Sequence, residues 1–131
     1  MSFIGTKTHG YLDYIMGALL IAAPWIFDFN RGGAETWVPV VLGAGVILYS
    51  LLTDYELGVS PQISMRTHLM LDLVGGALLA VSPWLFGFAD YVWGPHLIFG
   101  LLEMGAALMT ERTPGTDRHL HRRHHHTAAT H

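Results

Sequence analysis

Two histidine–aspartate pairs with the same spacing are the residues of this sequence best suited to chemistry. His9 precedes Asp13 by four positions, and His68 precedes Asp72 by four. Residues four apart share one face of a helix, so each pair presents an imidazole and a carboxylate together. A further acid, Glu103, lies in a later apolar stretch. Its distance from the end of that stretch is similar to the distance of each aspartate from the end of its own stretch. These five residues form the candidate ion, proton or metal site.

Three interpretations of this candidate site are open. The histidines and aspartates can simply satisfy one another near helix ends, where the helix dipole stabilises a carboxylate. They can relay protons or hold a transported ion, because ionisable residues inside a membrane are functional candidates. Imidazole and carboxylate groups also suit a divalent metal such as Zn, Mn or Fe, with haem ligation as a weaker variant. No cofactor is predicted, and a divalent metal is the one group kept open.

The elements that must position these residues are long apolar stretches. The chain has 131 residues, of which 51% are hydrophobic and 13% charged, about half the charged share of a soluble domain. Four stretches, at about 9–29, 37–53, 67–88 and 92–110, carry few charges. At 1.5 Å per residue, each roughly matches the 30 Å hydrocarbon core of a bilayer. The sequence therefore predicts an all-α bundle of four transmembrane helices.

The sequence is duplicated. Residues 8–29 match residues 67–88 at 12 of 22 positions, and a Trp-x-Pro start follows each copy, at Trp37 and Trp93. Each copy is a two-helix repeat, so we expect both to have the same topology, related by a pseudo-twofold axis along the membrane normal. The expected organisation is a short N-terminal segment (1–7), repeat 1 (8–56), a cytoplasmic linker (57–66), repeat 2 (67–110) and a tail (111–131).

A short motif closes the first helix of each copy. It reads Ser82-Pro83-Trp84 in the second copy, and in the first copy the variant Ala23-Pro24-Trp25. A Ser-Pro-Trp motif in a duplicated two-helix membrane unit resembles the SPW-repeat family of small prokaryotic integral membrane proteins. The resemblance covers about residues 8–110. It implies an architecture, and neither an activity nor catalytic residues.

The motif residues have a structural interpretation. Pro24 and Pro83 each free the carbonyl four positions earlier, and the Ser82 hydroxyl can bond such a carbonyl within its own copy. Trp25 and Trp84 suit the membrane interface. We therefore expect helix ends with interfacial tryptophan anchors rather than a hinge. His96 is expected at the same outer interface.

Charge placement predicts the topology. Six of the seven Lys and Arg residues fall on the side of the termini and the linker, and only Arg31 falls on the other. The positive-inside rule then places both termini in the cytoplasm of a multi-pass protein of the cell membrane. The tail is polar and rich in His and Arg, and we expect it to be disordered or to lie on anionic lipid. The net charge of −3 gives no general footprint for nucleic acid.

The sequence contains no nucleophile–base pair, phosphate-binding loop or metalloprotease spacing, and no cysteine. We predict a non-catalytic integral membrane protein with a structural, accessory or binding role. One alternative is a proton or cation transport component that uses the His-x-x-x-Asp faces and Glu103. Another is a metal-dependent membrane enzyme. The expected partners are the lipid bilayer and a second copy or a membrane complex, because four short helices alone make a narrow pathway.

Overall fold

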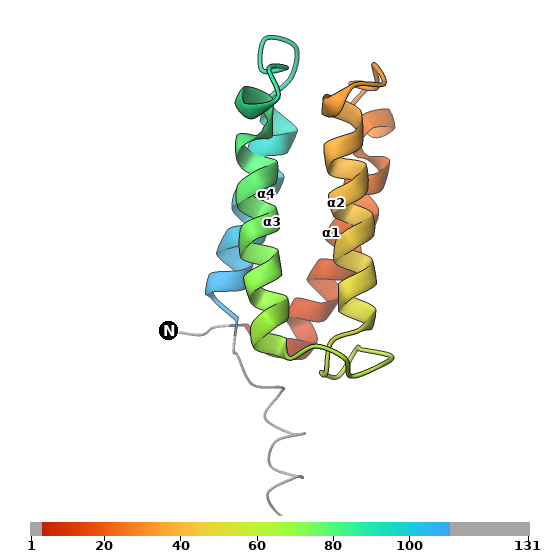
Figure 1. The fold of residues 1–131 in the computed structure, drawn as a ribbon, viewed down its shortest axis with the longest axis vertical. Helices are drawn as coiled ribbons and strands as arrows, with labels where there is room; N and C mark the ends of the chain where they lie inside the picture. Colours follow the sequence, from red (N-terminus) through yellow and green to blue (C-terminus); the bar gives the residue numbers. More distant parts are fainter. Residues whose placement is uncertain (1–3, 111–131) are drawn as a thin grey trace, which may run out of the picture.

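The computed structural model describes residues 4–110, and four α-helices account for most of them (Figure 1). The helices are α1 (Thr6–Ile26), α2 (Ala34–Leu51), α3 (Met65–Leu85) and α4 (Gly94–Leu108). Extended pairing within the described residues is limited to two isolated bridges, Ile4 with Thr110 and Thr53 with Ile63. The predicted all-α class is therefore confirmed for this part of the chain.

Helices α1 and α3 begin earlier than their apolar stretches predict. The expected starts are residues 9 and 67, whereas the helices begin at Thr6 and Met65. In α3 the side chain of Ser64 accepts a hydrogen bond from the Thr67 N–H at 3.1 Å and caps the helix. Asp13 and Asp72 consequently lie beyond the first helical turn, where the helix dipole has lost most of its influence.

The same kind of backbone turn ends α1 and α3. Asp28 and Gly87, two residues beyond each helix, have φ angles of 56° and 78°. The N–H of Phe29 donates to the carbonyl of Pro24 at 2.9 Å, and the equivalent bond after α3 measures 2.8 Å. In this Schellman arrangement a left-handed residue turns the chain over the helix end. It stops both helices three residues before the predicted ends and buries Phe29 and Phe88.

The motif serine bonds the carbonyl that its proline frees. Ser82 Oγ donates to the Leu79 carbonyl at 2.7 Å, as the sequence predicts. The first copy has Ala23 at this position and therefore no hydroxyl to make the same bond. The serine thus satisfies one backbone group of its own helix.

The four helices form two hairpins, α1 with α2 and α3 with α4, which lie side by side in Figure 1. Packing is dense within each hairpin and sparse between them. Glycine pairs allow the close approach. A Cβ on Gly43 would lie 2.6 Å from the Gly17 carbonyl oxygen, and one on Gly100 would lie 2.5 Å from that of Gly76. The small residues that continue each His-x-x-x-Asp face therefore pack within a hairpin.

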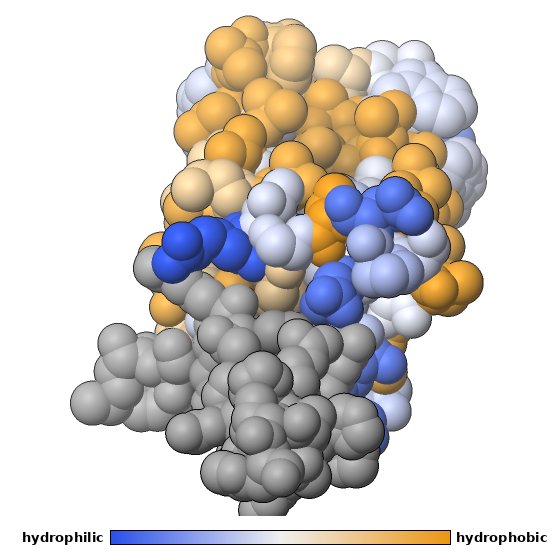
Figure 2. Space-filling view, turned by 60° about the horizontal axis from the view of Figure 1, so that its bottom comes forward, coloured by the Kyte–Doolittle hydropathy of each residue, from blue (hydrophilic) through white to orange (hydrophobic). Residues whose placement is uncertain are grey.

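Large hydrophobic side chains cover the outside of the helices. Figure 2 shows them over the visible flank, with hydrophilic residues gathered at the end that faces the viewer. Two helices, α2 and α3, are long and apolar enough to cross a membrane, and α4 is apolar but shorter. The four tryptophans are 51–56% exposed. They are Trp25, Trp37, Trp84 and Trp93.

The predicted tail, residues 111–131, and residues 1–3 lie outside the described residues. The prediction that the tail is disordered or lies on anionic lipid therefore remains a prediction.

Candidate functional site

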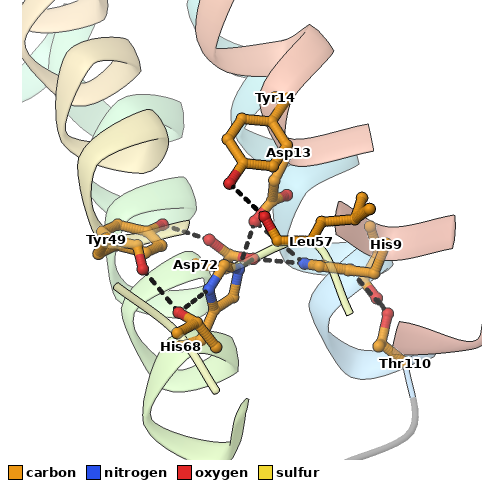
Figure 3. A network of polar contacts seen from close by, with 10 residues as sticks. His9, Asp13, Tyr14, Tyr49, Leu57, His68, Asp72 and Thr110 are labelled. Carbon is orange, nitrogen blue, oxygen red and sulfur yellow. Dashed lines mark hydrogen bonds and ion pairs between the residues drawn. The ribbon is translucent and has the colours of Figure 1, made fainter. Parts of the chain in front are cut away.

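The two His-x-x-x-Asp pairs meet in one buried centre between the hairpins (Figure 3). His9 and Asp13 come from α1, His68 and Asp72 come from α3, and all four side chains are 0% exposed. The shortest contacts cross between the helices. His9 Nε2 lies 2.5 Å from Asp72 Oδ2, and His68 Nε2 lies 2.7 Å from Asp13 Oδ2. The contacts within each helix are longer, at 3.1 and 3.3 Å.

A threonine fixes the orientation of each imidazole. His68 Nδ1 lies 2.7 Å from Thr53 Oγ1, and His9 Nδ1 lies 2.8 Å from Thr110 Oγ1. Thr53 Oγ1 donates its hydrogen to the Tyr49 carbonyl at 2.6 Å, and Thr110 Oγ1 donates to the carbonyl four residues before it at 2.5 Å. A hydroxyl has one hydrogen, so each threonine must accept the bond from its histidine. Both Nδ1 atoms therefore carry a hydrogen, and both Nε2 atoms face the aspartates.

The outer oxygens of the two aspartates differ in their partners. The Tyr49 hydroxyl donates to Asp72 Oδ1, whereas Asp13 Oδ1 is buried and has no hydrogen-bond partner within residues 4–110. The position of Tyr49 corresponds to Ala106 in the second repeat, and Ala106 has no hydroxyl to offer. A buried carboxylate oxygen without a partner is costly. The centre is therefore symmetric in its inner contacts and asymmetric in its outer ones.

Glu103 lies beside this centre but is not one of the four converging residues. It lines the same cavity as Asp72, and the residue is 5% exposed. Its Oε1 atom has no hydrogen-bond partner among the described residues. The structure thus brings all five predicted site residues together, four as a ring and Glu103 as a neighbour.

The connection between α2 and α3 packs over the buried centre, at the end of the bundle where α3 begins. The Tyr55 ring lies 5.6 Å from the His68 ring, and Tyr14 donates to the Leu57 carbonyl at 2.9 Å. A Cβ on Gly10 would lie 2.6 Å from the Tyr55 ring, so a glycine is needed there for close packing. Burial raises the pKa of the Tyr55 phenol above its ordinary value, which keeps this ring neutral next to the histidine.

Three members of the network are absent from the sequence prediction: Tyr49, Thr53 and Thr110. The two threonines could have been found from the duplication of the sequence. Thr53 and Thr110 stand at equivalent ends of the two repeats, 57 positions apart. Tyr49 has no equivalent in the second repeat and left no such signal.

The Ser-Pro-Trp residues lie far along the helices from this centre, at the C-terminal ends of α1 and α3. Pro24, Ser82 and Pro83 are buried, whereas Trp25 and Trp84 are more than half exposed. The motif therefore forms helix ends with outward tryptophans.

His96 does not occupy the exposed interfacial position that the sequence suggested. The residue is 1% exposed, and its Nε2–H donates to the Glu35 carbonyl at 2.9 Å. Its ring lies 4.9 Å from that of Phe29 and 4.8 Å from that of Phe88. The Schellman turns direct both phenylalanines inward, and they enclose the imidazole between the hairpins.

The chemistry of the centre follows from its donors. Each Nε2 lies within 3.3 Å of the Oδ2 atoms of both aspartates. A lone pair on nitrogen and a carboxylate oxygen repel each other, so either a proton or a bound cation must lie between them. One ligand atom from each of the four residues lies within 4.8 Å of the others. The arrangement can therefore hold protons or a cation between α1 and α3.

The family model of the SPW repeat domain matches residues 7–110 of this chain. Comparisons with curated proteins and with solved structures find no match. Together with the two long apolar helices, the family match indicates a membrane protein. The repeat and its Ser-Pro-Trp motif now have both a structural context and a matching family, and the chain belongs to the SPW repeat family.

Proposed function

We propose that this chain is a non-catalytic, four-span protein of the cell membrane, with an accessory or binding role. The observation that carries the proposal is the buried His/Asp centre, to which each repeat contributes one histidine and one aspartate. Sparse packing between the hairpins makes this centre a principal link between them. The centre therefore serves to bind an ion and to join the repeats.

The exposed surface supports a membrane crossing by α1 and α4 as well as by α2 and α3. Ile15 of α1 is 57% exposed, and Ile98, Leu101 and Leu102 of α4 are 54–56% exposed. Hydrocarbon is the environment in which such outward side chains are stable. The cross-paired centre and the equivalent glycine contacts further support a pseudo-twofold axis along the membrane normal.

The positions of basic and aromatic residues support a topology with both termini in the cytoplasm. Arg66 is the second residue of α3, at the end that carries the 52–64 connection, and the tryptophans gather at the opposite ends of the hairpins. Basic residues favour the cytoplasmic side, and tryptophan favours the interface.

A binding role agrees better with the donors than catalysis does. Four protein donors surround the centre, whereas catalytic metal or acid–base sites keep a position open for substrate. The second candidate is a proton or cation transport component, which the unpartnered Oε1 of Glu103 favours. Transport would also need a second copy or another membrane partner to widen the pathway.

Single-cysteine labelling tests the membrane topology directly, because the chain has no cysteine of its own. The variants are Asn30→Cys, Asp90→Cys and Gln62→Cys, all at exposed positions in connections between helices. A membrane-impermeant maleimide should label residues 30 and 90 in intact cells, and residue 62 only after the cells are broken. Recovery of the chain in the soluble fraction, or labelling of 30 and 90 from opposite sides, would refute the proposal.

A further inference from the structure

We propose that the buried centre binds one divalent transition-metal ion, best matched by Zn²⁺, through His9, Asp13, His68 and Asp72. This inference rests on the binding role proposed above and names the ligand. The four residues are fully buried, and each offers one ligand atom within 4.8 Å of the others. They come from two helices, each with the i, i+4 spacing that places two ligands on one face.

The four ligand atoms form a closed ring, because each histidine nitrogen lies within 3.3 Å of an oxygen of both aspartates. The short contacts of 2.5 and 2.7 Å alternate around the ring with contacts of 3.1 and 3.3 Å. An N–H bond points towards one acceptor, so protons alone would serve two of the four contacts well. A tetrahedral zinc ion with bonds of about 2.0–2.1 Å holds its ligands about 3.3 Å apart. To bind zinc, the shortest contact would open by about 0.8 Å, and the ligand atoms across the ring, which lie within 4.8 Å of each other, would move to about 3.3 Å.

The orientation of the imidazoles matches metal ligation. Thr53 and Thr110 accept the Nδ1 hydrogens, which leaves both Nε2 atoms facing inward. A ligating histidine generally donates its other N–H to a neighbouring acceptor, which fixes the tautomer. Tyr49 similarly donates to the outer oxygen of Asp72. These three residues are thus the positioning residues of the site.

The charge and the donor types select the class of ion. A divalent cation balances two aspartates and leaves both histidines neutral, the form in which imidazole binds metals. Two nitrogen and two oxygen donors suit Zn²⁺ or a related transition metal, whereas Mg²⁺ and Ca²⁺ require more oxygen ligands. A bound cation would also stabilise the Asp13 carboxylate, whose buried Oδ1 has no hydrogen-bond partner among the described residues. Four protein ligands make the site structural, and the ion would fasten α1 to α3.

The test uses the full chain, with the tail histidines replaced by serine so that they supply no ligand. These are His119, His121, His124, His125, His126 and His131. This parent protein is purified in detergent without a histidine tag, loaded with Zn²⁺ or Co²⁺ and freed of excess metal. We expect about one zinc ion per chain and the visible absorption of tetrahedral Co²⁺. A parent that retains no zinc, or shows only the weak spectrum of octahedral Co²⁺, would overturn the proposal.

Matched variants identify the ligands. Asp72→Asn should lose the bound zinc, whereas Glu35→Gln, which changes a buried acid at the opposite end of the helices, should retain it. Thr53→Val should weaken zinc affinity about 10–100-fold while the tetrahedral Co²⁺ spectrum persists. Equal zinc retention in the parent and in Asp72→Asn would contradict the assignment.

A variant that adds a spectroscopic signal gives a test that a loss of stability cannot imitate. Asp13→Cys replaces one oxygen ligand by sulfur, a good ligand for the same class of metal. It should add a sulfur-to-cobalt charge-transfer band in the near ultraviolet. The control Leu12→Cys lies at an exposed neighbouring position and should add none. A folded, monodisperse Asp13→Cys protein without the band would also overturn the proposal.

The outcomes separate this inference from the proposed function. A four-span labelling pattern combined with a parent that binds no zinc refutes the metal and leaves the membrane proposal intact. A chain that binds zinc but gives a different labelling pattern refutes the topology alone.

Discussion

Gly76→Ala and Gly75→Ala form a neighbouring pair of substitutions with opposite expected effects. A Cβ on Gly76 would lie 2.8 Å from the Gly100 carbonyl oxygen and 2.9 Å from Met104 Cγ, whereas one on Gly75 meets nothing within 4 Å. Ordinary contact begins at 3.4 Å, so α3 and α4 would have to separate by about 0.6 Å. Overpacking of this kind costs about 1–3 kcal/mol. Both substitutions also gain up to about 1 kcal/mol of helix propensity.

The free energy of unfolding of both variants can be compared in detergent micelles by titration with a denaturing detergent. Gly76→Ala should be less stable than Gly75→Ala by about 1–3 kcal/mol, because the propensity gain is common to both. The separation would also move Glu103, which lies one turn beyond Gly100 on α4. Equal stability of the two variants would refute the close packing of α3 against α4.

Three further substitutions test other parts of the structure by the same unfolding measurement. Tyr49→Phe removes the hydrogen bond to Asp72 and should cost about 1.5–3 kcal/mol, and an unchanged stability would contradict that contact. Ser82→Ala removes the bond to the Leu79 carbonyl and should cost about 1 kcal/mol, and a loss above about 3 kcal/mol would show another role. His96→Ala leaves a cavity and an unpaired Glu35 carbonyl, so a loss of about 2–4 kcal/mol is expected; a neutral result would mean that His96 is exposed.

The duplication made the candidate site predictable. It gave the two His-x-x-x-Asp pairs the same place in two like repeats, and the buried carboxylates favoured the inside of a bundle. The duplication did not predict which histidine contacts which aspartate. The i, i+4 spacing suggests contacts within each helix, whereas the shortest contacts join His9 to Asp72 and His68 to Asp13. Which contact is shorter depends on the distance between α1 and α3, and that distance is a tertiary property.

The ends of the helices and the burial of His96 could not be predicted from local sequence patterns. Apolar residues continue past Ile26, but Asp28 adopts a left-handed conformation and stops α1. Aspartate is less typical of that conformation than glycine, so the end of α1 could not be predicted from this residue. His96 stands at the end of an apolar stretch, which favoured an interfacial position. Its burial depends on Phe29 and Phe88, which come from two other segments of the chain.

X-ray absorption at the zinc edge identifies the ligand atoms around the metal in the intact protein, and so tests the four proposed ligands together. The measurement uses the full chain with serine in place of the tail histidines, loaded with Zn²⁺. We expect a four-coordinate shell of two imidazole nitrogens and two carboxylate oxygens at about 2.0–2.2 Å. A six-coordinate oxygen shell, or a protein that retains no zinc to measure, would contradict it.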